Sequence, residues 1–322
     1  MYNLNYLELF ILNTIIYFDL FDYPLTLGEI HNFLFTGGME GASFSLSEIT
    51  ECLQTSLKLK KVIATQRGFY FLKNREEIIQ TRLERYVSAQ NKFKIVNRAI
   101  KIFKYLPFIK LVAICNNLAL SNAKKESDLD LFIITSQKRI WAVRFVCIFL
   151  IAILGLRPPK EKAQDKICLS FFTTEDNLDL AKIKITAEDV YLVFWLATLR
   201  PVYARQNFYA KLMAANLWLK KYLPNWQEQK LGFRYRLEDN KLNKIIYKTK
   251  EFFWHGFLGD WAEKIFKNIQ FRLMSQKKKD LAVQPDTGVI ISDSMLKFHL
   301  QDRRLEIMAE FEKRRKELVE KM

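Results

Sequence analysis

The stretch LVAICNNLALSNAKKESDLDLFIIT, residues 111–135, decides the fold. It opens with the short apolar run LVAIC and ends with DLDLFIIT, 128–135, whose β-branched and aromatic residues favour a strand. Side chains two residues apart on a strand point to the same side, so Asp128 and Asp130 are expected to project together from the start of this strand. Two carboxylates that close repel each other unless a cation lies between them. The pair therefore predicts a divalent metal site.

The segments on both sides of this stretch predict an α/β core. A long helix is expected over 76–106, because apolar residues recur there every three or four positions. After the acidic strand, the apolar residues 138–156 predict a second helix, which ends at two prolines. KICLSFFT, 166–173, then predicts a third strand. Strands separated by helices are typical of an α/β fold.

The order of these elements resembles the nucleotidyltransferase superfamily related to DNA polymerase beta. The resemblance covers 111–135, where a strand, a tight turn and a short helix precede a strand with an Asp-x-Asp pair. It implies a two-metal mechanism in which Asp128 and Asp130 are catalytic and hold Mg²⁺ or Mn²⁺. The ions would clamp an NTP substrate while an acceptor hydroxyl attacks the α-phosphorus and releases pyrophosphate.

The turn and the loop before the acidic strand supply the other candidate nucleotide-binding residues. The family's turn reads Gly-Ser or Gly-Gly, which lets backbone amides approach the phosphates, whereas Asn116 and Asn117 stand there in this sequence. Asparagine tolerates left-handed backbone geometry, and its amide can donate to phosphate. Ser127 and Lys124 are expected to contribute as well, although a lysine in a loop is also a common solubility feature.

The third carboxylate of the family, which lies on a later strand and assists deprotonation of the acceptor, has no clear counterpart. The candidate strand 166–173 contains no acid. Asp165 lies just before that strand, and Glu175 and Asp176 lie just after it. We therefore expect the position to be filled by one of these three residues or by none.

The N-terminal residues 1–75 are expected to form a winged-helix domain. Helices are predicted over 9–20, 27–35 and 45–59, and the third would bury Leu46, Ile49, Leu53 and Leu57. KKVIATQRGFYFLK, 60–73, then predicts two short strands joined at Arg67-Gly68. Phe18 to Lys73 resembles the winged-helix domain that is often placed ahead of predicted nucleotidyltransferases. Such domains bind DNA or serve for packing and dimerisation.

Charge favours packing or dimerisation over DNA binding for this domain. The chain carries 51 basic and 35 acidic residues, a net +16, but residues 1–75 hold six basic and seven acidic residues. The excess lies in 76–200, with 20 basic and 13 acidic residues, and in 201–322, with 25 and 15. Affinity for nucleic acid depends on such an excess, so an RNA acceptor would meet these later segments. The long helix predicted over 76–106 presents either a solvated face or a contact surface for triphosphate or nucleic acid, through Arg82, Arg85, Lys92, Lys94, Arg98, Lys101 and Lys104.

The remaining residues, 186–322, are expected to form a mainly helical C-terminal domain. Breaks fall near Pro201, Pro224 and Gly256, and one late strand is predicted within 288–300 before a charged terminal helix. The aromatic residues of these helices fall at helical spacing and are expected in the core. His299 is either a packed strand-end residue or a general base.

Cysteine content and hydropathy bear on location. Cys52, Cys115, Cys147 and Cys168 lie singly in apolar runs, which favours buried thiols in a reducing compartment and predicts a cytoplasmic protein. The most apolar run, 145–156, is too short for a membrane span and predicts a helix buried on all sides. No stable membrane insertion is expected, and contact with a membrane surface through this run is the less favoured alternative.

Together these features predict an α/β (α+β) nucleotidyltransferase core, 76–185, between a winged-helix domain and a C-terminal helical region. The protein would be a Mg²⁺-dependent enzyme that moves NMP from an NTP to a hydroxyl on RNA, a protein or a small molecule. The alternative is a non-catalytic winged-helix protein that acts in regulation or nucleic-acid binding and carries a degenerate transferase domain. The turn at Asn116-Asn117 and the missing third acid favour this alternative.

Overall fold

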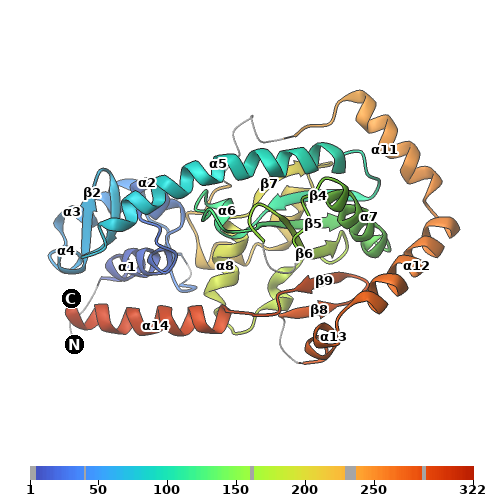
Figure 1. Ribbon diagram of the computed structural model, residues 1–322. Coiled ribbons are helices and arrows are strands. Elements are labelled where there is room, and N and C mark those ends of the chain that lie inside the picture. Colours follow the sequence, from blue (N-terminus) through green and yellow to red (C-terminus); the bar gives the residue numbers. More distant parts are fainter. Residues whose placement is uncertain (1–4, 40, 160–162, 229–236, 285–287) are drawn as a thin grey trace.

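A six-stranded sheet lies at the centre of the computed structural model, with strand order β7-β4-β5-β6-β9-β8 (Figure 1). The structure describes residues 5–39, 41–159, 163–228, 237–284 and 288–322. β5 and β6 run parallel, and the other neighbouring pairs of this sheet are antiparallel. The molecule is thus mixed α/β, as predicted. The strands of this sheet are β4 (Ile109–Ile114), β5 (Leu129–Thr135), β6 (Ile167–Thr174), β7 (Arg200–Ala204), β8 (Val289–Ile291) and β9 (Met295–Phe298).

Alternate residues of the central strands point to opposite faces of the sheet, and each face has its own core. Val112 and Ile133 pack on one face with residues of α5 and α7. Ala113 and Phe132 pack on the other face with residues of α8. The helices are α1 (Tyr6–Asp19), α2 (Leu27–Asn32), α3 (Leu46–Thr55), α4 (Leu59–Val62), α5 (Glu77–Phe103), α6 (Asn116–Ala119), α7 (Ile140–Ile153), α8 (Val190–Ala197), α9 (Phe208–Ala215), α10 (Leu219–Tyr222), α11 (Lys241–Phe253), α12 (Phe257–Leu273), α13 (Gln276–Ala282) and α14 (Arg304–Lys321).

The N-terminal part contains α1 to α4 and a three-stranded sheet of order β1-β3-β2. The hairpin β2 (Ile63–Gln66) and β3 (Phe69–Leu72) turns at Arg67 and Gly68, as predicted, and both residues have positive φ. β1 (Leu25–Thr26) pairs with β3. Thr26 caps α2, because its side chain accepts from the backbone N–H of Glu29 while the Glu29 carboxylate accepts from Thr26.

The helix predicted over 45–59 is correct through Thr55 and wrong beyond it. α3 ends at Thr55, and Ser56 takes an extended backbone. The Ser56 hydroxyl donates to Glu8 Oε1 at 2.5 Å and accepts from the backbone N–H of Leu59, so it begins the separate helix α4. The predicted buried face is correspondingly incomplete, since Ile49 and Leu53 are buried whereas Leu46 and Leu57 are exposed.

Aromatic rings join the N-terminal part to the central sheet. Phe194 of α8 stacks on Tyr17 with ring centroids 4.0 Å apart and meets Phe18 edge-on at 5.1 Å. The terminal helix α14 runs back beside α1 (Figure 1), where Arg314 Nη1 lies 2.5 Å from Asp19 Oδ2. The two parts therefore share one continuous core.

The C-terminal segment contributes three strands to the central sheet, two more than the sequence predicts. Residues 200–204 form β7 instead of a helix break; β7 is an edge strand, where Pro201 can stand because one side of the strand needs no N–H donor. The single strand predicted within 288–300 is the hairpin β8 and β9. Its turn is fixed by the Ser292 hydroxyl, which accepts from the backbone N–H of Met295 at 2.9 Å.

Three further predictions about burial are wrong. α7 is not buried on all sides, since Phe149 and Ile153 are exposed. The aromatic residues of α8 are buried as expected, whereas those around the α11–α12 junction are exposed, because these helices project from the body (Figure 1). On α5, Arg82 and Arg85 pair with acids of the N-terminal part, and Lys92 is buried. These three residues are therefore not part of the exposed basic face that the sequence predicts. No helix of the described residues is long and apolar enough to cross a membrane.

Candidate active site

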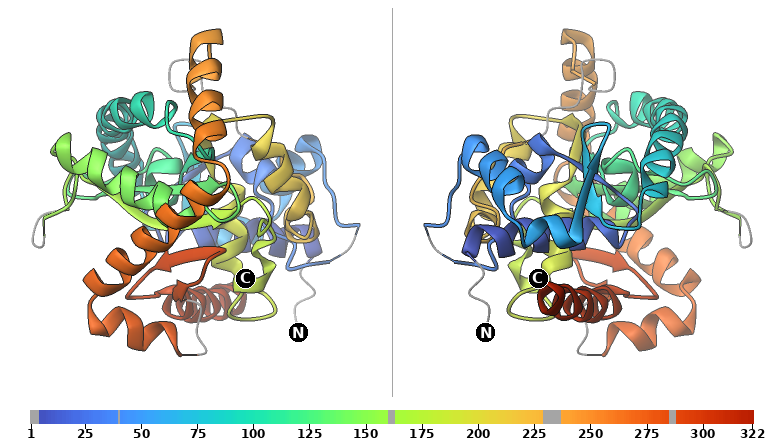
Figure 2. Two further views of the ribbon diagram at one scale, coloured as in Figure 1. Left: turned by 90° about the vertical axis from the view of Figure 1, so that its right-hand side faces the viewer. Right: turned by 90° about the vertical axis from the view of Figure 1, so that its left-hand side faces the viewer.

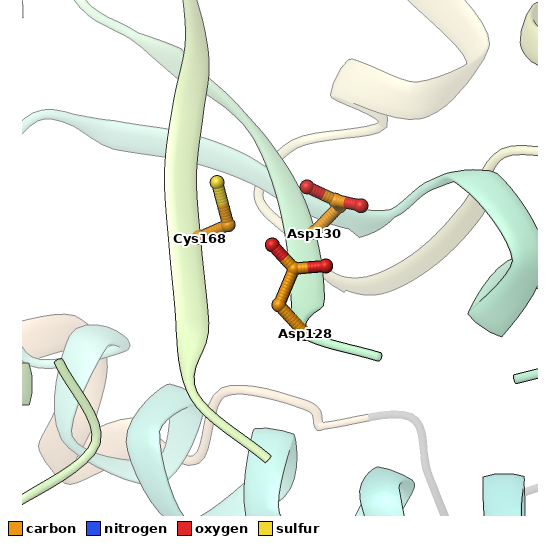
Figure 3. Close-up of side chains that lie close together, drawn as sticks. All are labelled: Asp128, Asp130 and Cys168. Atoms are coloured by element: carbon orange, nitrogen blue, oxygen red, sulfur yellow. The ribbon is translucent and has the colours of Figure 1, made fainter. Parts of the chain in front are cut away.

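Two aspartates and a cysteine meet where β5 begins (Figure 3). Asp128 immediately precedes β5, Asp130 lies on it, and Cys168 is the partner of Asp130 on the parallel strand β6. One carboxylate oxygen of each aspartate and Cys168 Sγ lie within 4.8 Å of one another. The two-residue spacing of the aspartates therefore brings them together, as the sequence predicts.

The environment of the pair disfavours its negative charge. Burial, together with the neighbouring Asp128 carboxylate, raises the pKa of Asp130 to about 6. Burial also raises the pKa of Asp128, although backbone hydrogen bonding and Lys92 oppose the change. In the part of the chain that the structure describes, neither carboxylate has an ion-pair partner. A cation placed between them would stabilise both ionised forms.

Asn116, the first residue of the predicted turn, contacts the acid pair directly. Its backbone has a φ of 57°, the left-handed conformation that asparagine tolerates. Its Nδ2 donates to Asp130 Oδ2 at 2.8 Å, and the Tyr191 hydroxyl donates to its Oδ1 at 3.3 Å. Asn117 lines the same cleft. The Asn116 amide thus stabilises the Asp130 carboxylate in this structure.

A cleft of about 440 Å³ surrounds the acid pair, and its wall includes basic residues that lie far along the sequence. Lys297 and His299 come from the end of β9 and the residue after it, while Arg303 and Arg304 stand at the start of α14. β9 pairs with β6, the neighbour of the acid-bearing strand β5, so the sheet itself brings this C-terminal segment to the acid pair. The volume is in the range of sites that hold a small ligand.

Burial lowers the pKa of two basic residues of the cleft. It lowers the pKa of Lys297 to about 8, and Arg304 adds to this effect while Asp302, 3.4 Å from Lys297 Nζ, opposes it. Burial and Lys297 lower the pKa of His299 to about 4, so this histidine is neutral near pH 7 and a weak base. Arg304 pairs with Asp302 and with Asp189 at 3.1 Å. The wall thus combines cations whose positions are fixed by internal acids.

Lys124 and Ser127 are absent from the described residues that line this cleft. Lys124 lines a second cavity of about 550 Å³, between α5 and the loop that precedes β5. The Ser127 hydroxyl donates to the backbone carbonyl of Lys124 at 2.9 Å, and its own carbonyl accepts from Lys92 Nζ at 2.8 Å. These two residues therefore shape the loop that leads to Asp128.

The three acids considered for the third carboxylate also lie elsewhere. Asp165 pairs with the buried Lys92 at 2.7 Å and lines the second cavity. Glu175 and Asp176 follow the opposite end of β6, where both contact Gln137. The neighbour of the acid pair on β6 is Cys168, whose thiol donates to Asp130. Burial raises the pKa of this thiol to about 12, so it stays protonated near neutral pH.

Sequence reasoning missed Cys168, Lys297, Arg304 and Tyr191 as residues of the site. Only the alternative role of His299 as a general base pointed to the C-terminal contribution, because the pairing of β9 with β6 leaves no local pattern in the sequence. No protein-family model, curated protein or solved structure matches the chain.

Proposed function

We propose that this protein is a Mg²⁺-dependent nucleotidyltransferase that moves NMP from an NTP to an acceptor hydroxyl. The observation that carries the proposal is the meeting of Asp128 and Asp130 in a cleft whose wall also holds Lys297 and Arg304. A carboxylate pair suits divalent cations, and a cationic wall suits the phosphates that the cations bridge. The proposal includes a nucleotidyltransferase core built on β4, α6, β5 and β6, and a winged helix formed by the N-terminal part.

Asp128 and Asp130 would hold Mg²⁺. Their oxygens are the ligands that Mg²⁺ prefers, and their raised pKa values reflect the repulsion and burial that a cation would relieve. Cys168 fits the ion less well, because its protonated thiol is a soft and weak ligand. When bound, the metal would neutralise charge on the triphosphate and position the α-phosphorus for attack by the acceptor oxygen.

The rest of the cleft supplies surfaces for phosphate and base. Lys297 is protonated below pH 8 and adds positive charge to the cleft wall, as does Arg303. The cleft is also lined by the partly exposed ring of Phe21, against which a nucleobase can pack. With a pKa of about 4, His299 is too weak a base to deprotonate the acceptor efficiently near pH 7, which favours its role as a packed residue.

A second candidate function is non-catalytic nucleotide-dependent regulation or assembly. Two observations favour it. The Asn116 amide is engaged with Asp130, and Cys168 stands beside the acid pair where a carboxylate would complete it. The winged helix would then act as a packing or dimerisation module, in line with its lack of basic excess.

Incubation with each α-labelled NTP, Mg²⁺ or Mn²⁺ and a cell extract tests the enzymatic proposal. Wild type should transfer label to an acceptor, and Asp128→Asn with Asp130→Asn should abolish the transfer. A matched control is Glu175→Gln with Asp176→Asn, which removes two carboxylates at the far end of β6 and should leave the labelling unchanged. Equal labelling by wild type and the Asp128 and Asp130 variant would sink the proposal.

A further inference from the structure

Six large apolar side chains lie exposed at the junction of α11 and α12. Phe252 and Phe257 are 79% and 82% exposed, and the other four are between 49% and 66% exposed. This junction projects from the side of the molecule that lies away from both chain termini (Figures 1 and 2). We call the six residues the aromatic patch: Phe252, Phe253, Trp254, Phe257, Leu258 and Trp261.

The patch continues along α11 as a single stripe. Leu242 and Ile245 are 60% and 62% exposed, and their spacing from Phe252 and Phe253 places all four on one face of the helix. The opposite face carries the buried residue Tyr247. The apolar stripe of α11 therefore points away from the protein, which is the reverse of an ordinary surface helix.

The charges around the patch are sorted by sign. Residues 241–284 hold ten basic and four acidic residues. Three of the four acids point into the body. Glu251 accepts from Arg205 at 3.1 Å, Asp260 from Arg139 at 2.6 Å, and Glu263 from the backbone N–H groups of Trp141 and Ala142.

Three lysines of the same helices are directed to solvent. Lys244 and Lys248 flank the stripe on α11, and Lys264 follows the patch on α12; all three are exposed. An exposed aromatic surface bordered by lysines, with its acids turned inward, is complementary to an apolar layer that lies beneath negative charge. Tryptophan and phenylalanine favour the boundary between lipid chains and headgroups, and lysines favour anionic headgroups.

We propose that α11 and α12 dock the protein on the surface of a membrane that contains anionic lipid. The aromatic patch would enter the boundary between headgroups and acyl chains, while the flanking lysines would contact the headgroup phosphates. A second copy of this chain is a poorer occupant, because it would bring an equal excess of lysines against these. A nucleic acid is a poorer occupant too, since Leu242, Ile245 and Leu258 offer neither charge nor a stacking ring.

Sedimentation with lipid vesicles tests this docking. The full chain should bind vesicles of phosphatidylcholine with about one-third phosphatidylserine, bind phosphatidylcholine alone at least about tenfold more weakly, and lose affinity as salt is raised. Phe253→Ser with Phe257→Ser and Trp261→Ser should weaken the binding at least about tenfold. The matched control, Leu57→Ser with Leu83→Ser and Tyr86→Ser, changes exposed apolar residues elsewhere and should bind like wild type.

Tryptophan fluorescence gives a second readout on the same samples. Trp254 and Trp261 are half-exposed, so their emission should shift to shorter wavelength when anionic vesicles are added. Failure of wild type to bind, or equal binding by the patch variant and wild type, would overturn the proposal. So would a wild-type dimer in solution that the patch variant dissociates, because a second copy would then cover the patch.

Discussion

Substitution of Asp130 by asparagine should stabilise the protein in the absence of metal. The carboxylate is buried beside Asp128, and its pKa of about 6 means that ionisation costs more in the folded than in the unfolded chain. Asparagine has the same shape, carries no charge and retains an oxygen that can accept from Asn116 Nδ2. The variant therefore removes the repulsion and keeps the contact.

The magnitude follows from the pKa values. The difference between the ordinary 3.8 and about 6 corresponds to about 3 kcal/mol as an upper limit, since the cleft admits solvent to the group. The folded pKa lies above the unfolded one, so the folded state binds more protons between these values, and wild-type stability falls as the pH rises from about 4 to about 6. The gain from Asp130→Asn is thus near zero at about pH 4 and complete above about pH 7, where it raises Tm by at most about 4 °C.

Thermal unfolding with a chelator at pH 4 and at pH 7.5 measures this gain in stability. The measurement at pH 7.5 is then repeated with Mg²⁺. Wild type should gain stability from Mg²⁺ at pH 7.5, whereas Asp130→Asn should not. Asp176→Asn is the control, because that carboxylate lies at the far end of β6. A variant that is less stable than wild type at pH 7.5, or that gains as much at pH 4, would refute the electrostatic account of the pair.

Three more predictions concern groups around the cleft and the core. Lys92→Met should lower stability by about 3 kcal/mol in chemical denaturation, because it leaves Asp165 and two loop carbonyls without their buried donor; an unchanged midpoint would contradict this. Phe194→Ala should cost about 3 to 5 kcal/mol by the same measurement, since rings from the N-terminal part pack on it, whereas a loss below about 1 kcal/mol would show that the two parts pack independently. In wild type, nucleotide affinity should fall as the pH rises through about 8, because Lys297 loses its proton there. The Lys297→Met variant should bind nucleotide more weakly than wild type at pH 7 and show no such fall. A fall of equal size in wild type and variant would exclude Lys297 from the site.

The acid pair could be predicted from the sequence because its geometry is local. On a strand, a spacing of two residues is enough to place Asp128 and Asp130 on one side. The turn at Arg67-Gly68 could be predicted for the same reason, since the residues that determine its backbone conformation and the strands around it are adjacent in the sequence. The core that α5 and α7 form with β4, β5 and β6 follows from apolar periodicity for the same reason.

The remainder of the site depends on strand pairing between distant segments. Lys297 reaches the cleft because β9 pairs with β6, and a short strand next to a serine turn gives little indication of its partner. β7 could not be predicted because it contains Pro201, and a proline is compatible with a strand only at a sheet edge. The aromatic patch is exposed although its residues were expected in the core. Helical spacing shows that aromatic side chains share a face but does not show whether that face points inward.

Isothermal titration calorimetry with Mg²⁺ and non-hydrolysable analogues of the four common NTPs tests the central claim most directly. Wild type should bind at least one of these analogues at a single site and only when Mg²⁺ is present. Asp128→Asn with Asp130→Asn should abolish the Mg²⁺-dependent binding while the protein stays folded. Glu175→Gln with Asp176→Asn should bind like wild type. Absence of binding by wild type for all four analogues, or equal binding by the Asp128 and Asp130 variant, would contradict the assignment of this cleft as a metal and nucleotide site.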